Sequence, residues 1–121
     1  MILDSNILIG YLNGDRDIIS ALQAWRESGT VLFISSVSAI EALSLSSLTS
    51  ADVTAIENFL SDFIVVPLDM HIVRTAGALR REHRLSVPDA AIIATATANN
   101  LPLVTRDKKI RAVSGVMFAE I

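Results

Sequence analysis

The chain has 121 residues, of which 51% are hydrophobic and 19% are charged. This length suits one domain with a buried core, and this composition excludes an intrinsically disordered chain. Cysteine is absent, which excludes disulfides and thiolate chemistry and favours a reducing, cytoplasmic setting. No apolar run approaches the ~18 residues of a membrane span, and no basic segment typical of a signal peptide precedes the first apolar residues. We therefore expect a single domain over residues 1–121.

The net charge of −3 conceals an asymmetry along the chain. Residues 1–73 contain nine acidic and two basic residues, a net charge of −7. Residues 74–121 contain four acidic and eight basic residues, a net charge of +4. The second part could therefore contact a polyanion, but the simpler explanation, which we favour from the sequence alone, is that Arg80, Arg81 and Arg84 only solvate a helix face.

Short apolar runs alternate with helical patterns along the whole chain. Thr49 and Asp52 have the spacing of a capping box, and Pro88 is suited to a first helical turn. In chain order we expect a strand at 1–3, a short helix capped by Ser5 or Asn6, a helix at 17–28 ended by Gly29, a strand at 31–34, a helix at 37–47 capped by Ser36 or Ser38, a helix after Thr49, a strand at 63–66, a helix after Asp69, a helix from Pro88 to Asn99–Asn100, and strands at 101–105 and 116–119.

This alternation predicts a parallel sheet covered by helices on both faces, and ligands of such sheets bind at the carboxyl ends of the strands. Four acidic residues are expected at that edge. Asp4 follows the first strand, and Glu41 lies early in the helix after the second strand. Asp89 lies in the first turn of the helix before the strand at 101–105, and Asp107 comes two residues after Thr105.

Each of these acids also has a purely structural explanation. Asp4 could cap the first helix, Glu41 could close a capping box with Ser38, Asp89 could favour the positive end of its helix, and Asp107 could be a turn residue. Four facing carboxylates repel one another by a few kcal/mol per close pair at an effective dielectric of ~20. A cluster of this kind persists by holding protons or cations, and its hard oxygen ligands suit Mg²⁺ or Mn²⁺. Such ions, alone or in pairs, support phosphodiester hydrolysis.

Four segments together resemble the PIN domain, a metal-dependent nuclease fold, and more narrowly the VapC toxins of prokaryotic toxin–antitoxin pairs. They are LDSNILI at 3–9, SAIEAL at 38–43, PDAAIIATA at 88–96 and LPLVTRDKKI at 101–110. The resemblance implies an α/β/α sandwich with a parallel sheet of about five strands, and an endoribonuclease that uses Mg²⁺ or Mn²⁺. It implies Asp4, Glu41, Asp89 and Asp107 as the acidic quartet, with Asp4 and Asp89 carrying the metal most directly.

The same resemblance implies supporting residues and partners. Ser5, Asn6 and Thr105 match positions where the family has hydroxyl or amide side chains, although Ser5 replaces a commoner threonine. Relatives commonly dimerise and are blocked by an antitoxin peptide that reaches the acidic edge. For the RNA substrate, the candidate contacts are Arg106, Lys108, Lys109, Arg80 and Arg81.

Three alternatives remain open at this point. A signalling receiver domain would use Asp69 and Thr105, but it would leave Glu41 and Asp89 without a role. A phosphatase with an aspartyl nucleophile would need a second acid where the chain has Asn6. The non-enzymatic alternative is a catalytically silent PIN-like module that binds RNA or a protein.

Overall fold

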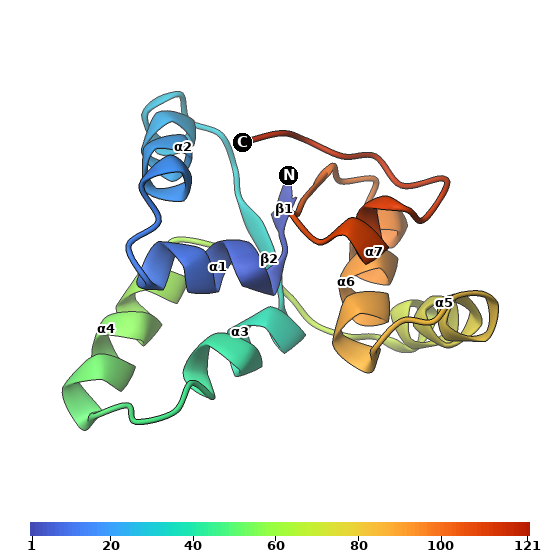
Figure 1. The fold of residues 1–121 in the computed structure, drawn as a ribbon, viewed down its shortest axis with the longest axis horizontal. Coiled ribbons are helices and arrows are strands. Elements are labelled where there is room, and N and C mark those ends of the chain that lie inside the picture. Colours follow the sequence, from blue (N-terminus) through green and yellow to red (C-terminus); the bar gives the residue numbers. More distant parts are fainter.

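A computed structural model describes residues 1–121 of the protein. Four short parallel strands form its centre (Figure 1). The strands are β1 (Ile2–Leu3), β2 (Phe33–Ser35), β3 (Ile64–Val66) and β4 (Leu103–Val104). The helices are α1 (Ser5–Leu12), α2 (Arg16–Glu27), α3 (Ser36–Leu43), α4 (Ser50–Leu60), α5 (Met70–Glu82), α6 (Val87–Ala98) and α7 (Lys108–Arg111). The strand order is β3-β2-β1-β4. A receiver domain has the order 2-1-3-4-5, so the receiver alternative is wrong.

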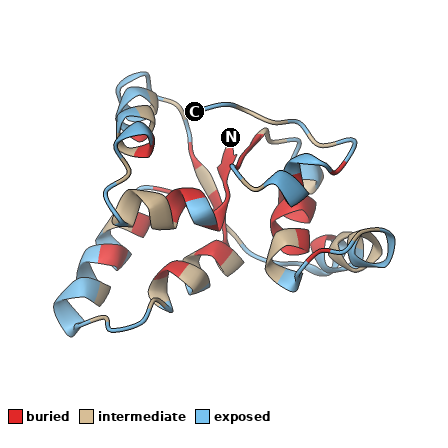
Figure 2. Ribbon diagram, in the orientation of Figure 1, coloured by how far each residue is buried: buried red, intermediate tan, exposed pale blue.

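Side chains of the strands alternate between two apolar cores, one on each face of the sheet. Leu3, Ile34 and Val104 pack in a core with residues of α1, α2 and α4. Ile2 and Leu103 pack in a second core with residues of α6 and α7. The two helical layers lie on opposite sides of the strands in Figure 1, and Figure 2 shows buried residues on the strands and on the helices next to them. The expected α/β/α sandwich is therefore confirmed.

The fifth strand is shorter than expected. Instead of a strand at 116–119, the structure has one parallel bridge between Leu103 and Phe118. Two backbone hydrogen bonds make this bridge, from Leu103 N to Met117 O and from Ala119 N to Leu103 O. Beyond it, Glu120 pairs with Arg111 and the chain leaves the sheet. At the other edge of the sheet, β3 is largely exposed. None of the helices has the length and apolar character that a membrane span requires.

The caps of the helices confirm some of the sequence signals and correct others. Thr49 and Asp52 form the expected capping box, Asp69 caps α5, and Asn100 adopts the left-handed conformation with φ 52° after α6. The N-cap of α1 is Asp4, whose backbone is extended, rather than Ser5 or Asn6, which lie inside the first turn of the helix.

Two helices differ from the expected spans. The helix expected at 37–47 begins one residue earlier, is capped by Ser35 rather than Ser36 or Ser38, and ends at Leu43. The short helix α7 was not expected, because its four residues are too few to show a helical period. It begins directly after Asp107, which makes that residue an N-cap.

Two isoleucines test where the stability of this fold resides. Ile34 is fully buried in the central strand β2, whereas Ile40 on α3 is 63% exposed. We expect Ile34→Ala to lower the free energy of unfolding by roughly 2–5 kcal/mol, because it opens a cavity in the core. Ile40→Ala is the matched control and should change that free energy by less than about 0.5 kcal/mol. Urea unfolding followed by circular dichroism measures both, and equal effects would contradict the described core.

Candidate active site

Asp4 lies at the carboxyl end of β1 and is buried, with 1% of its surface exposed. Its backbone N–H donates to Val104 O at 3.0 Å, which continues the sheet ladder by one residue. Although Asp4 is the N-cap of α1, its side chain makes no capping hydrogen bond. Oδ2 instead accepts a hydrogen bond of 2.7 Å from the Thr105 hydroxyl. The capping explanation of the Asp4 carboxylate is therefore wrong.

The environment of Asp4 raises the pKa of its carboxyl group to about 6. Burial is the largest cause, and the hydrogen bond from Thr105 opposes it. The negative charges of Asp89 and Asp107 raise the pKa further. Asp89 and Asp107 thus lie near enough to Asp4 to disfavour its ionisation, as the topology argument predicts.

Thr105 connects Asp4 to the last of these acids. Its hydroxyl donates to Asp4 and accepts a hydrogen bond of 3.0 Å from the Asp107 backbone N–H. The Asp107 side chain caps α7, since Oδ1 accepts from Lys109 N at 2.8 Å and from Ile110 N at 3.4 Å. Asp107 is therefore a helix cap through Oδ1, rather than the turn residue considered above, while Oδ2 takes no part in the cap and remains free for a ligand.

Glu41 joins the site through a serine. It is half-buried on α3, and its Oε1 accepts a hydrogen bond of 2.7 Å from the Ser5 hydroxyl. Ser5 directly follows Asp4 and is itself buried. A second buried hydroxyl, Ser38, lies 2.9 Å from Ser5. Ser38 does not cap α3, so the expected capping box with Glu41 is absent.

The remaining candidates, Asp89 and Asn6, lie in the first turns of helices. Asp89 is half-buried in the first turn of α6, where its backbone N–H donates to Ser86 at 3.2 Å and its carboxylate is left out of the cap. Asn6 is exposed in the first turn of α1. Among residues missed by the sequence argument, Ser38 matters most for the geometry. Its position three residues before Glu41 was visible in the sequence, but its contact across to α1 was not.

The predicted basic contacts are partly engaged within the protein. Arg106 pairs with Asp15, the N-cap of α2, at 2.7 Å. Arg80 Nε donates to Leu85 O at 3.1 Å, and Arg81 is exposed near the end of α5. The side chains of α7 that were predicted to contact RNA, those of Lys108 and Lys109, are exposed.

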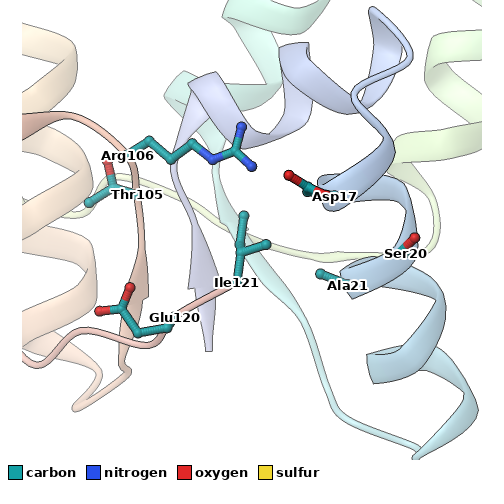
Figure 3. Close-up of a pocket in the computed structure, with 7 residues that line it drawn as sticks. All are labelled: Asp17, Ser20, Ala21, Thr105, Arg106, Glu120 and Ile121. Carbon is teal, nitrogen blue, oxygen red and sulfur yellow. The ribbon is translucent and has the colours of Figure 1, made fainter.

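Next to Thr105 the surface is hollowed by a pocket of about 510 Å³ (Figure 3). It is bounded by α2, by the loop after β4 and by the C-terminus, and its lining residues are Asp17, Ser20, Ala21, Thr105, Arg106, Glu120 and Ile121. Figure 3 shows the Arg106 side chain extending toward the start of α2. Since Thr105 also contacts Asp4, the pocket adjoins the acidic edge.

The donor chemistry of this edge fits a divalent cation. The available atoms are carboxylate and hydroxyl oxygens, which are the ligands that Mg²⁺ and Mn²⁺ prefer. Asp4 is buried near two other carboxylates and opposite no basic side chain, so a cation would offset the cost of its ionisation. As the side chains stand, no three of them form a group able to hold a metal ion. The residues present therefore fit a metal by type and placement, without a preformed cage.

The raised pKa of Asp4 predicts how stability depends on pH. The folded protein takes up a proton near pH 6 and the unfolded chain near pH 3.8, so the free energy of unfolding falls as the pH rises through this window. Asp4→Asn removes the ionisation and should raise that free energy at pH 7, without metal, by roughly 1–3 kcal/mol. The gain should vanish below about pH 4, where both states are protonated. Urea unfolding in EDTA from pH 3.5 to pH 7.5 measures this.

A capping aspartate provides the control of opposite sign. The backbone N–H of Thr49 lowers the pKa of Asp52, so Asp52→Asn should reduce stability at pH 7. If Asp4→Asn were also less stable than the unmodified protein at pH 7, Asp4 would not be a destabilised carboxylate.

Solved structures of other proteins share the fold of this chain. A chain from a toxin–antitoxin complex of Klebsiella pneumoniae is 32% identical, with a TM-score of 0.82 and coverage of 99% of this chain and 98% of that chain. A chain of VapBC2 from Rickettsia felis, solved with a DNA fragment from its promoter, shares the fold at 21% identity, with a TM-score of 0.84 and coverage of 99% and 97%. VapBC-1 from Haemophilus influenzae is also 21% identical, with a TM-score of 0.79 and coverage of 98% and 96%.

The search of curated proteins finds no match. The family description that matches is that of the PIN domain, and it covers residues 1–116. This range includes all four strands and every acid of the edge. The phosphatase alternative is therefore wrong, and the chain belongs to the PIN domain family.

Proposed function

We propose that this protein is a VapC-type toxin, a metal-dependent endoribonuclease that hydrolyses RNA phosphodiester bonds at its acidic edge. The observation that carries the proposal is Asp4, a buried carboxylate with other acids nearby and no basic partner. Membership of the PIN family and the 32% identity to a chain of a toxin–antitoxin complex support it. The proposal treats residues 1–121 as a single nuclease domain that acts in the cytoplasm.

The roles follow from how each carboxylate is held. Asp4 and Asp89 would carry the metal most directly, because neither side chain is used by a helix cap. Asp107 would complete the site with Oδ2, and Glu41 would orient a water or hold a second ion. When bound, Mg²⁺ or Mn²⁺ supplies positive charge to the phosphate and makes water a stronger acid. Thr105 keeps Asp4 in position, Ser5 keeps Glu41 in position, and Asn6 is exposed in the first turn of α1, next to Ser5.

Two partners belong to the same proposal. A cognate antitoxin would block the acidic edge, as supported by the solved toxin–antitoxin complexes whose chains share this fold. A second copy of the chain would cover the apolar surface at the start of α5 and α6, where Met70 and Val87 are each 58% exposed and Val73 is 44% exposed. Sedimentation of the purified chain tests the homodimer, and its co-purification with a co-expressed antitoxin tests the complex.

One observation favours the catalytically silent alternative, a PIN-like module that binds RNA or protein. No group of three acidic residues is already arranged to hold a metal ion. Mn²⁺ separates the two functions, because a metal present at 100 times its dissociation constant stabilises the fold by about 2.7 kcal/mol. An unchanged melting temperature at millimolar Mn²⁺ would favour the silent module.

The nuclease function is tested by removing single charges at the acidic edge. Asp4→Asn and Asp89→Asn should each reduce RNA cleavage at least about 100-fold while the protein stays folded, because each removes a metal-binding carboxylate. Asp62→Asn is the matched control, since Asp62 pairs with Arg26 away from the site. Cleavage of total RNA is followed on gels with Mn²⁺. Activity at the unmodified level in either site variant would disprove the assigned roles.

RNA binding is tested by the salt dependence of affinity. The double variant Arg106→Gln, Lys108→Gln should bind RNA more weakly. If both side chains contact phosphates, it should also lower the slope of log affinity against log salt by about 1.4. Fluorescence anisotropy in the Asp4→Asn background measures binding without cleavage. Arg74→Gln on α5 is the control for loss of one positive charge. An unchanged slope in the double variant would limit Arg106 to its pairing with Asp15.

A further inference from the structure

The threonine side chains inside the helices of this protein bond to their own helix. Four threonines donate to the carbonyl oxygen four residues earlier, at 2.7–3.1 Å: Thr54, Thr75, Thr95 and Thr97. Ser38 in α3 makes no such bond. It is fully buried, and its Oγ is hydrogen-bonded to Ser5 Oγ in α1 at 2.9 Å. The Ser38 hydroxyl is therefore directed across to a different helix.

The number of available protons determines the direction of this contact. A hydroxyl carries one proton, and an ionised carboxylate can only accept. Ser5 Oγ lies within hydrogen-bond distance of two oxygens, Ser38 Oγ at 2.9 Å and Glu41 Oε1 at 2.7 Å, and the heavy-atom geometry makes Ser5 a possible donor to each. The single proton of Ser5 can serve only one of them. If that proton goes to Glu41, the contact between the two hydroxyls requires the proton of Ser38, and the order is then Ser38 to Ser5 to Glu41.

This chain links the two parts of the acidic edge. Ser38 and Glu41 are three residues apart and share one face of α3, while Ser5 is the first residue after Asp4. Asp4 is held by the sheet ladder, by burial and by Thr105. Glu41 has a longer side chain, is only half-buried and receives one hydrogen bond from a side chain, that of Ser5. Its position thus depends on which way the Ser5 hydroxyl points.

We propose that Ser38 is a positioning residue for the nuclease site. It fixes the Ser5 hydroxyl as a donor to Glu41 and so keeps the Glu41 carboxylate at the edge occupied by Asp4. The inference rests on the proposed function, in which Glu41 orients a water or holds a second ion. Without the Ser38 hydroxyl, Ser5 is free to rotate and Glu41 loses its fixed donor.

The first experiment compares three variants by two readouts, the Mn²⁺ dependence of RNA cleavage and the Mn²⁺ dependence of the melting temperature. Ser38→Ala removes the cross-helix donor and should raise the Mn²⁺ concentration for half-maximal response about 10-fold in both readouts, at the lower end of the range known for metal outer-shell changes. Ser38→Thr keeps a hydroxyl and should restore most of the response. Thr95→Val is the matched control, because Thr95 is equally buried but bonds only to Ala91 O.

The second experiment tests the chain of hydrogen bonds without metal or RNA. Urea unfolding in EDTA is measured for Ser38→Ala, Glu41→Ala and the double variant, with and without Ser5→Ala. Ser38 and Glu41 make no hydrogen bond to each other, so their effects on the urea midpoint should be non-additive only through Ser5. We expect non-additivity that disappears in the Ser5→Ala background.

The outcomes separate this inference from the proposed function. If the unmodified protein responds to Mn²⁺ and Ser38→Ala responds equally, the nuclease proposal stands and the role of Ser38 is overturned. If the unmodified protein neither binds Mn²⁺ nor cleaves RNA, the proposed function fails together with the positioning role at its site. Additive effects of Ser38→Ala and Glu41→Ala would overturn the hydrogen-bonded chain in either case.

Discussion

The acidic edge is built around one unfavourable interaction, the burial of the Asp4 carboxylate at the end of a two-residue strand. Removing an ionised group from water costs several kcal/mol unless a partner offsets this cost. The hydrogen bond from Thr105 offsets only part of the cost for Asp4, since the pKa of the Asp4 carboxyl group is still raised to about 6. The fold thus maintains a carboxylate that is disfavoured as an anion and that a bound cation would stabilise. In the absence of metal, the protein is therefore less stable because it keeps a carboxylate at the position where the proposed chemistry needs negative charge.

The sheet places this carboxylate with little freedom. Ile2 and Leu3 point into opposite cores, and the next residue is Asp4, whose N–H still bonds to the neighbouring strand β4. Shifting the register by one residue would turn Leu3 toward the wrong core and displace Asp4 from Thr105. The apolar residues that stabilise the sheet are therefore the same ones that align the acid with its hydrogen-bond donor.

The sequence was sufficient for those features that follow from local spacing and topology. The capping box at Thr49 and Asp52, the left-handed Asn100 and the convergence of Asp4 with Asp89 and Asp107 were predicted in this way. Long-range side-chain contacts were not predictable by such rules. Arg106 and Asp15 are separated by 91 positions in the sequence, and Ser5 and Ser38 by 33. Neither contact follows from a helical or strand period, because such periods relate only neighbouring residues of one element.

The two ends of the acidic edge are built by different means, which explains why two sets of hydroxyls are present. Asp4 has a short side chain on a strand end, where the backbone already limits its position, and the Thr105 hydroxyl and the backbone N–H of Ser5 are enough to orient it. Glu41 extends from a helix by a longer side chain that has more rotamer freedom to lose. A single serine with a rotating hydroxyl would hold it poorly, because that serine has a choice of acceptors. In the proposed chain of hydrogen bonds, the buried Ser38 hydroxyl donates to Ser5 and so removes the choice. In this fold the carboxylate that the backbone controls least is therefore the one that needs the longest chain of side-chain support.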